Sequence, residues 1–127
     1  NSREKGVHFL QMWVMPNAQN TEPGYQQKSF VANHNRNMLV LAISPDGAEG
    51  SLKIKQDARM YVGRFDEDYE TSLTTEEGRR YWLQVAQGHI IVNDESAKAG
   101  DGFAIKGEDI ITLKSVTESE VVLFDLP

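Results

Sequence analysis

Hydrophobic residues in this chain occur mostly in short runs that are rich in Val, Ile, Leu, Tyr and Phe. Gly, Asp, Asn or Pro bounds most of these runs, and such punctuation is typical of β-strands joined by turns. The pattern predicts strands over residues 7–15, 26–30, 38–43, 51–56, 58–65, 81–87, 89–93, 103–105, 110–114 and 120–126. Strands that recur at this spacing predict an all-β fold, either a sandwich or a barrel.

The first run, residues 7–15, is apolar on both of its faces. His8 alternates onto the same face as Leu10, so we expect a buried or interfacial histidine there. A strand that is apolar on both faces is usually buried on both. The apolar residues of the two faces are Val7, Phe9, Trp13 and Met15 on one side and Leu10, Met12 and Val14 on the other.

Gly88 separates two adjoining predicted strands, 81–87 and 89–93. Glycine at such a point allows a positive φ or a β-bulge where a barrel strand bends. Residues 51–56 instead alternate, with Leu52 and Ile54 facing inward and lysines facing outward, which predicts a strand with one wet face.

Composition narrows the classes of function. The chain has 127 residues and 39% hydrophobic residues, which suits one compact domain with a real core. A net charge of −6 argues against partners that are nucleic acids or anionic membranes. The absence of cysteine excludes disulfides, thiol nucleophiles and Cys-based zinc sites. The apolar runs are too short to span a membrane, and we expect a cytoplasmic protein.

Few residues stand out as candidates for chemistry. The histidines His8, His34 and His89 are scattered, and no pair has metal-ligand spacing. The acidic run at 66–70 lacks the regular spacing of a calcium loop, so a solvated loop is expected. The polar residues at 76–80 could form a cluster in a barrel mouth or ordinary surface ion pairs. No nucleophile triad, P-loop or dinucleotide fingerprint is present, and we predict no catalytic residue.

Aromatic residues on alternating strand positions offer a candidate pocket for a flat ligand. Tyr61, Trp82 and Phe103 are its central members, and Trp13 and Tyr81 could join them. Ordinary core packing is the alternative explanation for aromatic residues at such positions.

Several motifs together resemble the pirin family of proteins with two cupin domains. The strand order, with Gly88 and the Gly-Asp-Gly turn at 100–102, is similar to a cupin barrel. The match is closest to the C-terminal cupin of bacterial pirin-like proteins of the quercetinase type. The matching motifs are Gln-Met-Trp-Val-Met-Pro at 11–16, Pro-Gly-Tyr-Gln-Gln-Lys-Ser-Phe at 23–30, Ser-Pro-Asp-Gly at 44–47, Gly-Ser-Leu at 50–52, Gln-Asp at 56–57 and Leu-Phe-Asp-Leu-Pro at 123–127.

The resemblance implies a cupin-type β-barrel, a double-stranded β-helix or jelly roll. It implies that residues 1–16 are the last strand of a missing N-terminal cupin, residues 17–37 a connecting segment, and residues 38–127 the C-terminal cupin barrel. The chain starts with Asn1 instead of Met and enters an apolar run at once, so we expect a trimmed piece of a longer protein.

The family also implies where metal would be bound. Its N-terminal barrel holds one iron-type divalent ion through three His and one Glu, and some members cleave quercetin with dioxygen. Counting back from Gly88, the corresponding ligand slots in this chain fall at Thr74, Glu76 and Arg80, and a later slot falls at Thr112 or Leu113. None of these is histidine, and Arg80 would repel a cation. We therefore predict no metal and no cofactor in this chain.

Two hypotheses of function follow. The first is a metal-free C-terminal cupin that supports the metal-bearing N-terminal barrel of a protein resembling quercetin 2,3-dioxygenase. The second is a stand-alone, non-catalytic binding or dimerisation module, which could be regulatory. The expected partner is the N-terminal cupin domain or a second copy in a strand-exchanged homodimer, because an unpaired apolar strand tends to associate.

Overall fold

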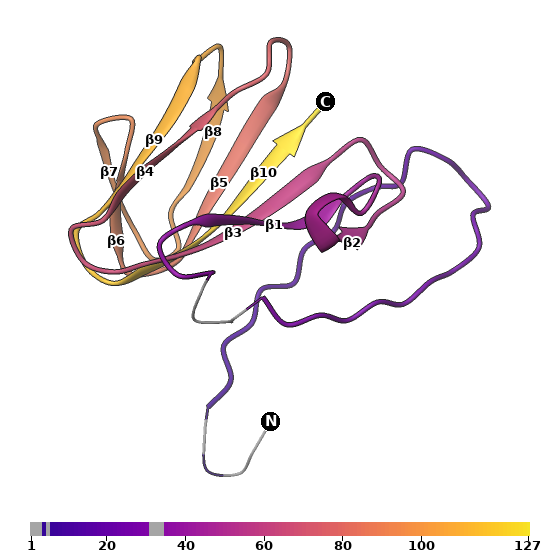
Figure 1. Cartoon of the computed structure of the whole chain (residues 1–127), viewed down its shortest axis with the longest axis horizontal. Coiled ribbons are helices and arrows are strands. Elements are labelled where there is room, and N and C mark those ends of the chain that lie inside the picture. The colour runs from indigo at the N-terminus through magenta and orange to yellow at the C-terminus, as the bar shows by residue number, and fades with distance from the viewer. Residues whose placement is uncertain (1–3, 5, 31–34) are drawn as a thin grey trace.

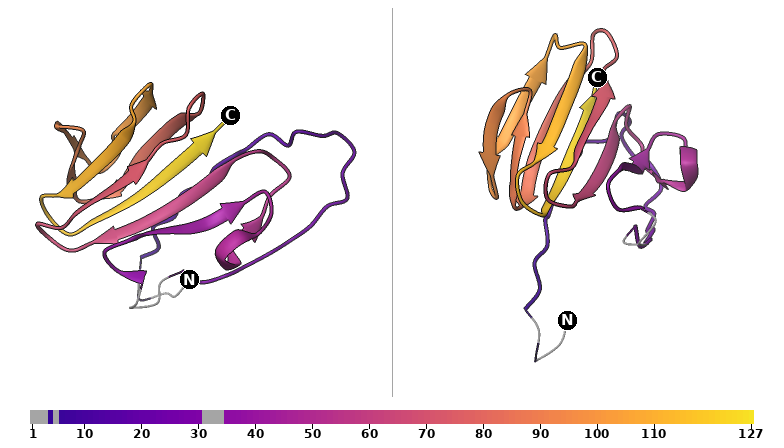
Figure 2. Two further views of the ribbon diagram at one scale, coloured as in Figure 1. Left: turned by 45° about the horizontal axis from the view of Figure 1, so that its top comes forward. Right: turned by 60° about the vertical axis from the view of Figure 1, so that its left-hand side comes forward.

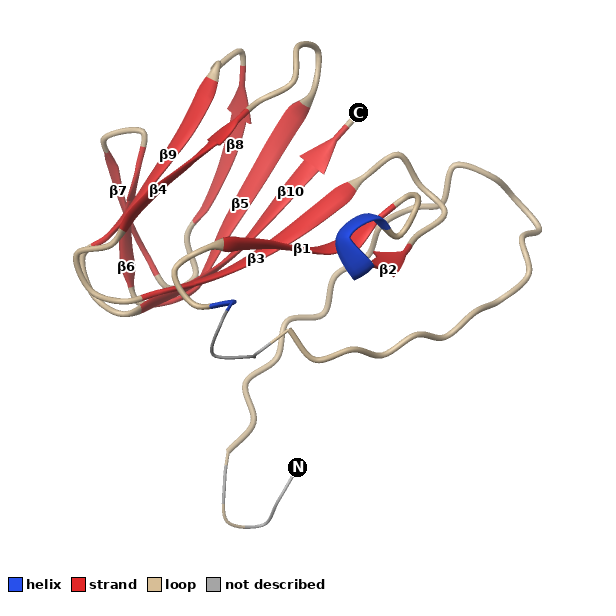
Figure 3. Cartoon of the chain, in the orientation of Figure 1, coloured by secondary structure: helices blue, strands red, loops and turns tan. Residues whose placement is uncertain are grey.

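The computed structural model describes residues 4, 6–30 and 35–127, and its regular elements are almost all β-strands, preceded by a long loop segment (Figure 1, Figure 3). The helical element with defined bounds, η2, is a single turn over Ala48–Gly50. The all-β class predicted from the sequence is therefore confirmed. The strands are β1 Leu39–Ser44, β2 Leu52–Lys53, β3 Arg59–Phe65, β4 Glu70–Thr74, β5 Arg80–Gln87, β6 His89–Val92, β7 Glu95–Lys98, β8 Gly102–Lys106, β9 Ile110–Ser115 and β10 Ser119–Leu126.

The strands of the described chain form two sheets that pack face to face (Figure 2). One sheet has six strands in the order β2-β1-β3-β10-β5-β8, and the other has four in the order β4-β9-β6-β7. The strands β1 and β2 pair in parallel, and the remaining neighbours pair antiparallel. Between the sheets lies a core of Phe65, Tyr81, Leu83, Val85, Ile90, Val92, Ala97, Ile105, Ile111, Leu113, Val121 and Leu123.

The larger sheet is apolar on both of its faces. Successive side chains of a strand point to opposite faces, so β10 sends Val121 and Leu123 into the core and Val122 to the outside. There Val122 forms a second cluster with Ala42 and Met60, against which Phe30, Ile43, Val62 and Phe124 pack. Phe30 belongs to the segment before β1, so part of the outer face is covered by chain that is itself outside the sheets.

Most strands with strong hydrophobic runs lie where the pattern predicts them, but two strands were missed. In β4, Leu73 is half-buried and is the single large aliphatic residue. In β7, Ala97 is the one buried residue. Both strands are mostly polar, because one face is exposed to solvent and the other carries few large side chains. Their sequences therefore show no clear hydrophobic pattern. The strand predicted over 51–56 is reduced to the two residues of β2.

The predictions for 7–15 and 26–30 are wrong for this chain. Residues 7–15 have no strand partner, and the expected burial on both faces is absent. Trp13 is 87% exposed, Met15 77% and Phe9 72%. His8 is exposed instead of buried, and its Nδ1 lies 3.3 Å from Nε2 of Gln87. The histidine at position 34 lies outside the described residues. Within the described ranges, no helix is long and apolar enough to cross a membrane.

Gly88 adopts the positive φ expected of it, at 85°. Of the two alternatives offered for this glycine, the positive φ is the one it adopts; the pairing of β5 with β10 shifts register two residues earlier, between Val85 and Gln87. A Cβ at position 88 would collide with the carbonyl oxygen of Glu118 and with the hydroxyl of Ser119. Backbone strain and close packing therefore both require glycine here.

We predict that Gly88→Ala lowers the free energy of unfolding by about 2–3 kcal/mol, because steric overlap adds to the cost of a positive φ. Gly78→Ala is the matched control, since Gly78 has φ 81° but open space around it. Urea denaturation of both variants tests this. Equal losses of stability in the two variants would contradict the role of the Glu118 and Ser119 contact.

Candidate functional site

The positions that the sequence offered as metal-ligand slots point away from the core. Thr74, Arg80 and Thr112 are exposed, and Glu76 lies in the turn between β4 and β5. Alternate residues of a strand point to opposite faces, so the neighbours of Thr74, Arg80 and Thr112 face the interior instead of these residues. Leu113, the alternative for the last slot, does face inward and is 1% exposed.

The side chains that do face the interior at these strands are apolar or aromatic. Tyr81 of β5 and Ile111 and Leu113 of β9 all belong to the core between the sheets. Within residues 4, 6–30 and 35–127, no group of three or more His, Cys, Asp or Glu side chains lies close enough to hold a metal ion. The space where strands of this barrel could present ligands is filled by hydrophobic packing.

A cluster of five charged residues closes the end of the sandwich where β10 ends. We call it the charge cluster, and its centre is Asp125, whose side chain is 4% exposed. Asp125 accepts a hydrogen bond from Nη1 of Arg59 at 2.9 Å and another from Nε of Arg79. Arg79 also pairs with Asp57 at 3.0 Å, and Arg59 pairs with Glu76 at 3.0 Å. The cluster thus ties β3 and the β4–β5 turn to the last strand.

The charges in this cluster stabilise one another. The hydrogen bond to Asp125 raises the pKa of Arg59 above its usual value. Burial opposes the charge of Arg79, but its hydrogen bonds to Asp125 and Asp57 raise its pKa overall. Burial also raises the pKa of the nearby Tyr81, whose hydroxyl accepts a hydrogen bond from the Glu76 backbone N–H at 2.9 Å. Both arginines are therefore fixed cations with carboxylate partners.

Sequence reasoning found two of the five members of this cluster. It placed Glu76 and Arg79 in a candidate polar cluster at the barrel mouth, and both are members. It missed Asp125, although a signal was present: a carboxylate stands at a position that alternates with the inward Val121 and Leu123. A recess of about 440 Å³ lies beside the cluster, lined by residues of the β4–β5 and β8–β9 turns and by Tyr81.

The three aromatic residues offered as a pocket do not line one cavity. Tyr61 and Phe103 pack against the core between the sheets. Trp82 lies on the opposite face of β5, is 41% exposed and packs closely over Gly102. Tyr81 is part of the core itself. Strand alternation separates Trp82 from the others, so the flat-ligand pocket is corrected to core packing on one face and a surface tryptophan on the other.

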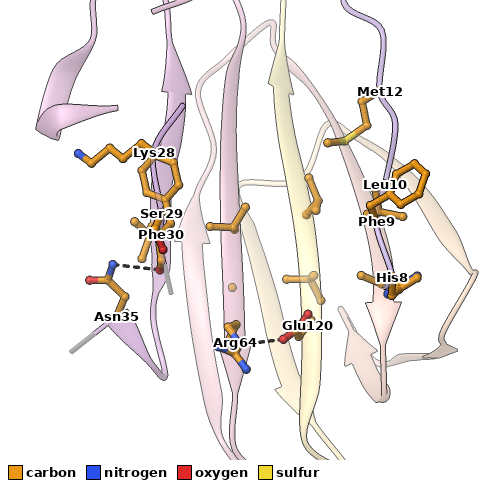
Figure 4. A pocket seen from close by; sticks show the side chains of 16 residues that line it. His8, Phe9, Leu10, Met12, Lys28, Ser29, Phe30, Asn35, Arg64 and Glu120 are labelled. Atoms are coloured by element: carbon orange, nitrogen blue, oxygen red, sulfur yellow. Dashed lines mark hydrogen bonds and ion pairs between the residues drawn. The ribbon is translucent and has the colours of Figure 1, made fainter. Parts of the chain in front are cut away.

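A second hollow is a groove on the outer face of the six-stranded sheet, with a volume of about 710 Å³ (Figure 4). We call it the outer groove. Its floor includes Val40, Val62 and Val122, which are paired in a row across β1, β3 and β10. Residues 8–12 form one wall, and residues 28–30 form the other (Figure 4). The sequence analysis did not find this groove, although its signal was an apolar residue at outward positions of three strands.

Comparison with known proteins shows which family has this architecture. The family model for the quercetinase C-terminal cupin domain matches residues 41–126. The chain belongs to this family of pirin C-terminal cupins. Its cupin jelly-roll fold also occurs in an RmlC-like cupin protein from Desulfovibrio desulfuricans, with a TM-score of 0.56 at 12% identity over 83% of this chain and 98% of the other.

Individual relatives of this pirin-type cupin show the same relationship. Quercetin 2,3-dioxygenase of Escherichia coli K12 is 36% identical over 126 residues, which are 99% of this chain and 53% of the relative. The pirin-like protein YhaK of the same organism is 30% identical over 99% of this chain and 54% of its own length. The chain spans about half the length of these curated relatives.

Solved structures of relatives also match the fold of this chain. The crystal structure of YhhW from Escherichia coli superposes with a TM-score of 0.84 at 36% identity, over 91% of this chain and 48% of the other. The bacterial pirin YhhW has also been solved in complex with nickel(II), and it matches this chain equally well.

We predict that Asp125→Asn lowers the free energy of unfolding by about 3 kcal/mol, because it leaves two arginines at a largely buried site without their shared carboxylate. Asp57→Asn is the control: the side chain of Asp57 is 57% exposed, and its loss should cost less than about 1 kcal/mol. Chemical denaturation of both variants gives the comparison. Similar costs for the two substitutions would show that Asp125 is not the centre of the charge cluster.

Proposed function

We propose that this chain serves as a metal-free C-terminal cupin that supports a metal-bearing N-terminal barrel in a protein with the activity of its quercetin 2,3-dioxygenase relatives. The observation that carries the proposal is the composition of the barrel interior. Tyr81, Ile111 and Leu113 occupy inward positions beside the expected ligand slots. Ile111 and Leu113 have no donor atom, and the Tyr81 hydroxyl accepts a hydrogen bond from the Glu76 backbone N–H, while burial raises its pKa and disfavours the phenolate that iron would need.

Two facts about relatives connect the chain to that activity. A relative of about twice its length is a quercetin 2,3-dioxygenase, and the related bacterial pirin YhhW has been solved with nickel(II). In this proposal the metal and the reaction belong to the N-terminal half of such a polypeptide. The present barrel contributes a rigid surface for that half, and its large sheet is suited to the task because it is apolar on both faces.

A second candidate function is a non-catalytic dimerisation module. The exposed apolar segment 7–15 favours it, because contiguous apolar surface of this kind marks an association site. The partner would then be a second copy with exchanged segments. The compartment that fits both candidates is the cytoplasm, since the chain carries no cysteine and needs no disulfide.

We expect the purified 127-residue chain to bind no stoichiometric iron, nickel, copper or zinc and to leave quercetin intact in the presence of dioxygen. Elemental analysis by mass spectrometry and the loss of flavonol absorbance measure the two properties. A chimera in which the first half of the Escherichia coli relative precedes this chain should bind metal and turn quercetin over. Stoichiometric metal together with quercetin cleavage by the chain alone would refute the proposal.

Light scattering separates the two candidates. A monomeric chain supports the role within a longer polypeptide. A stable dimer that dissociates when Trp13 is replaced by Asp would support the dimerisation module instead.

A further inference from the structure

The recess beside the charge cluster, which we call the mouth recess, lies between the β4–β5 turn at 75–79 and the β8–β9 turn at 107–109 (Figure 1). Thr75 joins the two turns: its N–H donates to the carbonyl oxygen of Asp109 at 3.0 Å, and its hydroxyl donates to that of Glu108. The volume of about 440 Å³ lies within the range of about 300–1,000 Å³ that is usual for small-molecule sites. The mouth recess therefore has the size of a ligand site.

The floor of the mouth recess carries a buried hydrogen-bond donor. Tyr81 and Ile105 line it from β5 and β8, and they are 4% and 8% exposed. The Tyr81 hydroxyl accepts a hydrogen bond from the N–H of Glu76 in the wall of the recess, and among the described residues no acceptor takes its own O–H. Burial raises the pKa of Tyr81, so the hydroxyl keeps this proton at neutral pH. Because a buried donor without an acceptor is costly, the hydroxyl favours a ligand atom that accepts a hydrogen bond.

The rim of the mouth recess is negatively charged. Carboxylates without an ion-pair partner among the described residues outnumber ammonium groups there, and they are Glu77, Glu108 and Asp109 against Lys106. Two further lining residues, Glu76 and Arg79, already have partners within the charge cluster. The summed field of the unpaired groups attracts a cation and disfavours a ligand that carries only negative charge.

The spacing of these carboxylates distinguishes an organic cation from a metal ion. In the parts of the chain that the structure describes, no three His, Cys, Asp or Glu side chains are grouped closely enough to hold one ion. A metal ion requires its ligands to converge on one point. Carboxylates that are spread around a recess instead suit an ammonium group on a molecule that is large enough to reach the floor as well.

We propose that the mouth recess binds a small hydroxylated amine, that is, an amino alcohol or an amino sugar. The ammonium group of the ligand lies among the rim carboxylates, and one of its hydroxyl oxygens accepts a hydrogen bond from Tyr81. Binding is non-covalent and uses residues of this chain alone. The site is thus independent of the supporting role proposed above, and failure of either proposal leaves the other intact.

Nuclear magnetic resonance of the ¹⁵N-labelled 127-residue chain tests the site with glucamine, the amine that corresponds to sorbitol. The amides of residues 75–79 and 107–109 should shift and saturate with a Kd of about 1 mM, as expected for a few polar contacts with exposed charges. Sorbitol has the hydroxyls but no charge, and it should bind at least about tenfold more weakly. Absence of saturable shifts at the two turns, or equal affinity for sorbitol, would overturn the proposal.

A matched pair of substitutions tests the rim. Glu77→Gln should weaken glucamine binding about two- to fivefold, the effect of one exposed charge. Glu67→Gln is the control: Glu67 is an exposed residue of the β3–β4 turn, at the opposite end of β4 and outside the recess, so its substitution should leave the Kd unchanged. Equal weakening by both substitutions would show attraction to the net charge of the chain and would overturn the site.

The floor is tested with Tyr81→Phe, which keeps the buried ring and removes the hydroxyl. Glucamine binding should weaken about fivefold or more, as for the loss of one hydrogen bond. Putrescine has ammonium groups but no hydroxyl, so its binding should stay the same in this variant. An equal loss for both amines, or no loss for glucamine, would contradict the role of Tyr81. If Tyr81→Phe does not fold, the exposed Glu77→Gln and Glu67→Gln pair still decides the proposal.

Discussion

The architecture depends on the alternation of side chains along β10, the strand at the centre of the larger sheet. This strand pairs with β3 on one side and β5 on the other. Its inward side chains Val121 and Leu123 pack in the core. The next inward residue, Asp125, forms ion pairs with two arginines at the end of the sandwich. Its outward Val122 contributes to the floor of the outer groove. One strand thus sets the core, the charge cluster and the external apolar face.

This arrangement is consistent with the supporting role that we propose for the barrel. A cupin that binds metal needs polar ligands on neighbouring inward positions, and here those positions carry packing residues. Among the residues that the structure describes, the buried charged residue is Asp125, whose carboxylate is neutralised by Arg59 and Arg79. The cluster holds the strand ends together. The unused apolar surface lies outside, where it can meet another domain.

The sequence predicts the strands that carry dense hydrophobic runs, and motif order predicts the family. Three features of the structure could not be predicted from the sequence, for physical reasons. The strands β4 and β7 are mostly polar because they lie in the smaller sheet with one wet face, so their period is hard to recognise. The outward orientation of Thr74, Arg80 and Thr112 was also not apparent, because counting from Gly88 cannot fix which face a strand position occupies.

The third feature is the segment at 7–15, whose hydrophobic pattern predicts a strand buried on both faces, whereas the structure shows it exposed and without a strand partner. Long-range partners such as Asp125 with Arg79 are separated by many residues, so they are apparent only when the strands are assembled. Even so, an acidic residue in phase with Val121 and Leu123 was a usable sign that a buried cation lay opposite.

The proposed function requires that the apolar core of this barrel leaves no place for a metal ion. Nuclear magnetic resonance of the methyl-labelled chain during titration with paramagnetic nickel(II) tests this most directly, because a bound ion broadens the signals of nearby groups. We expect the methyl signals of Ile111 and Leu113 to keep their intensity at saturating nickel. Selective loss of these signals at one equivalent of nickel would contradict it.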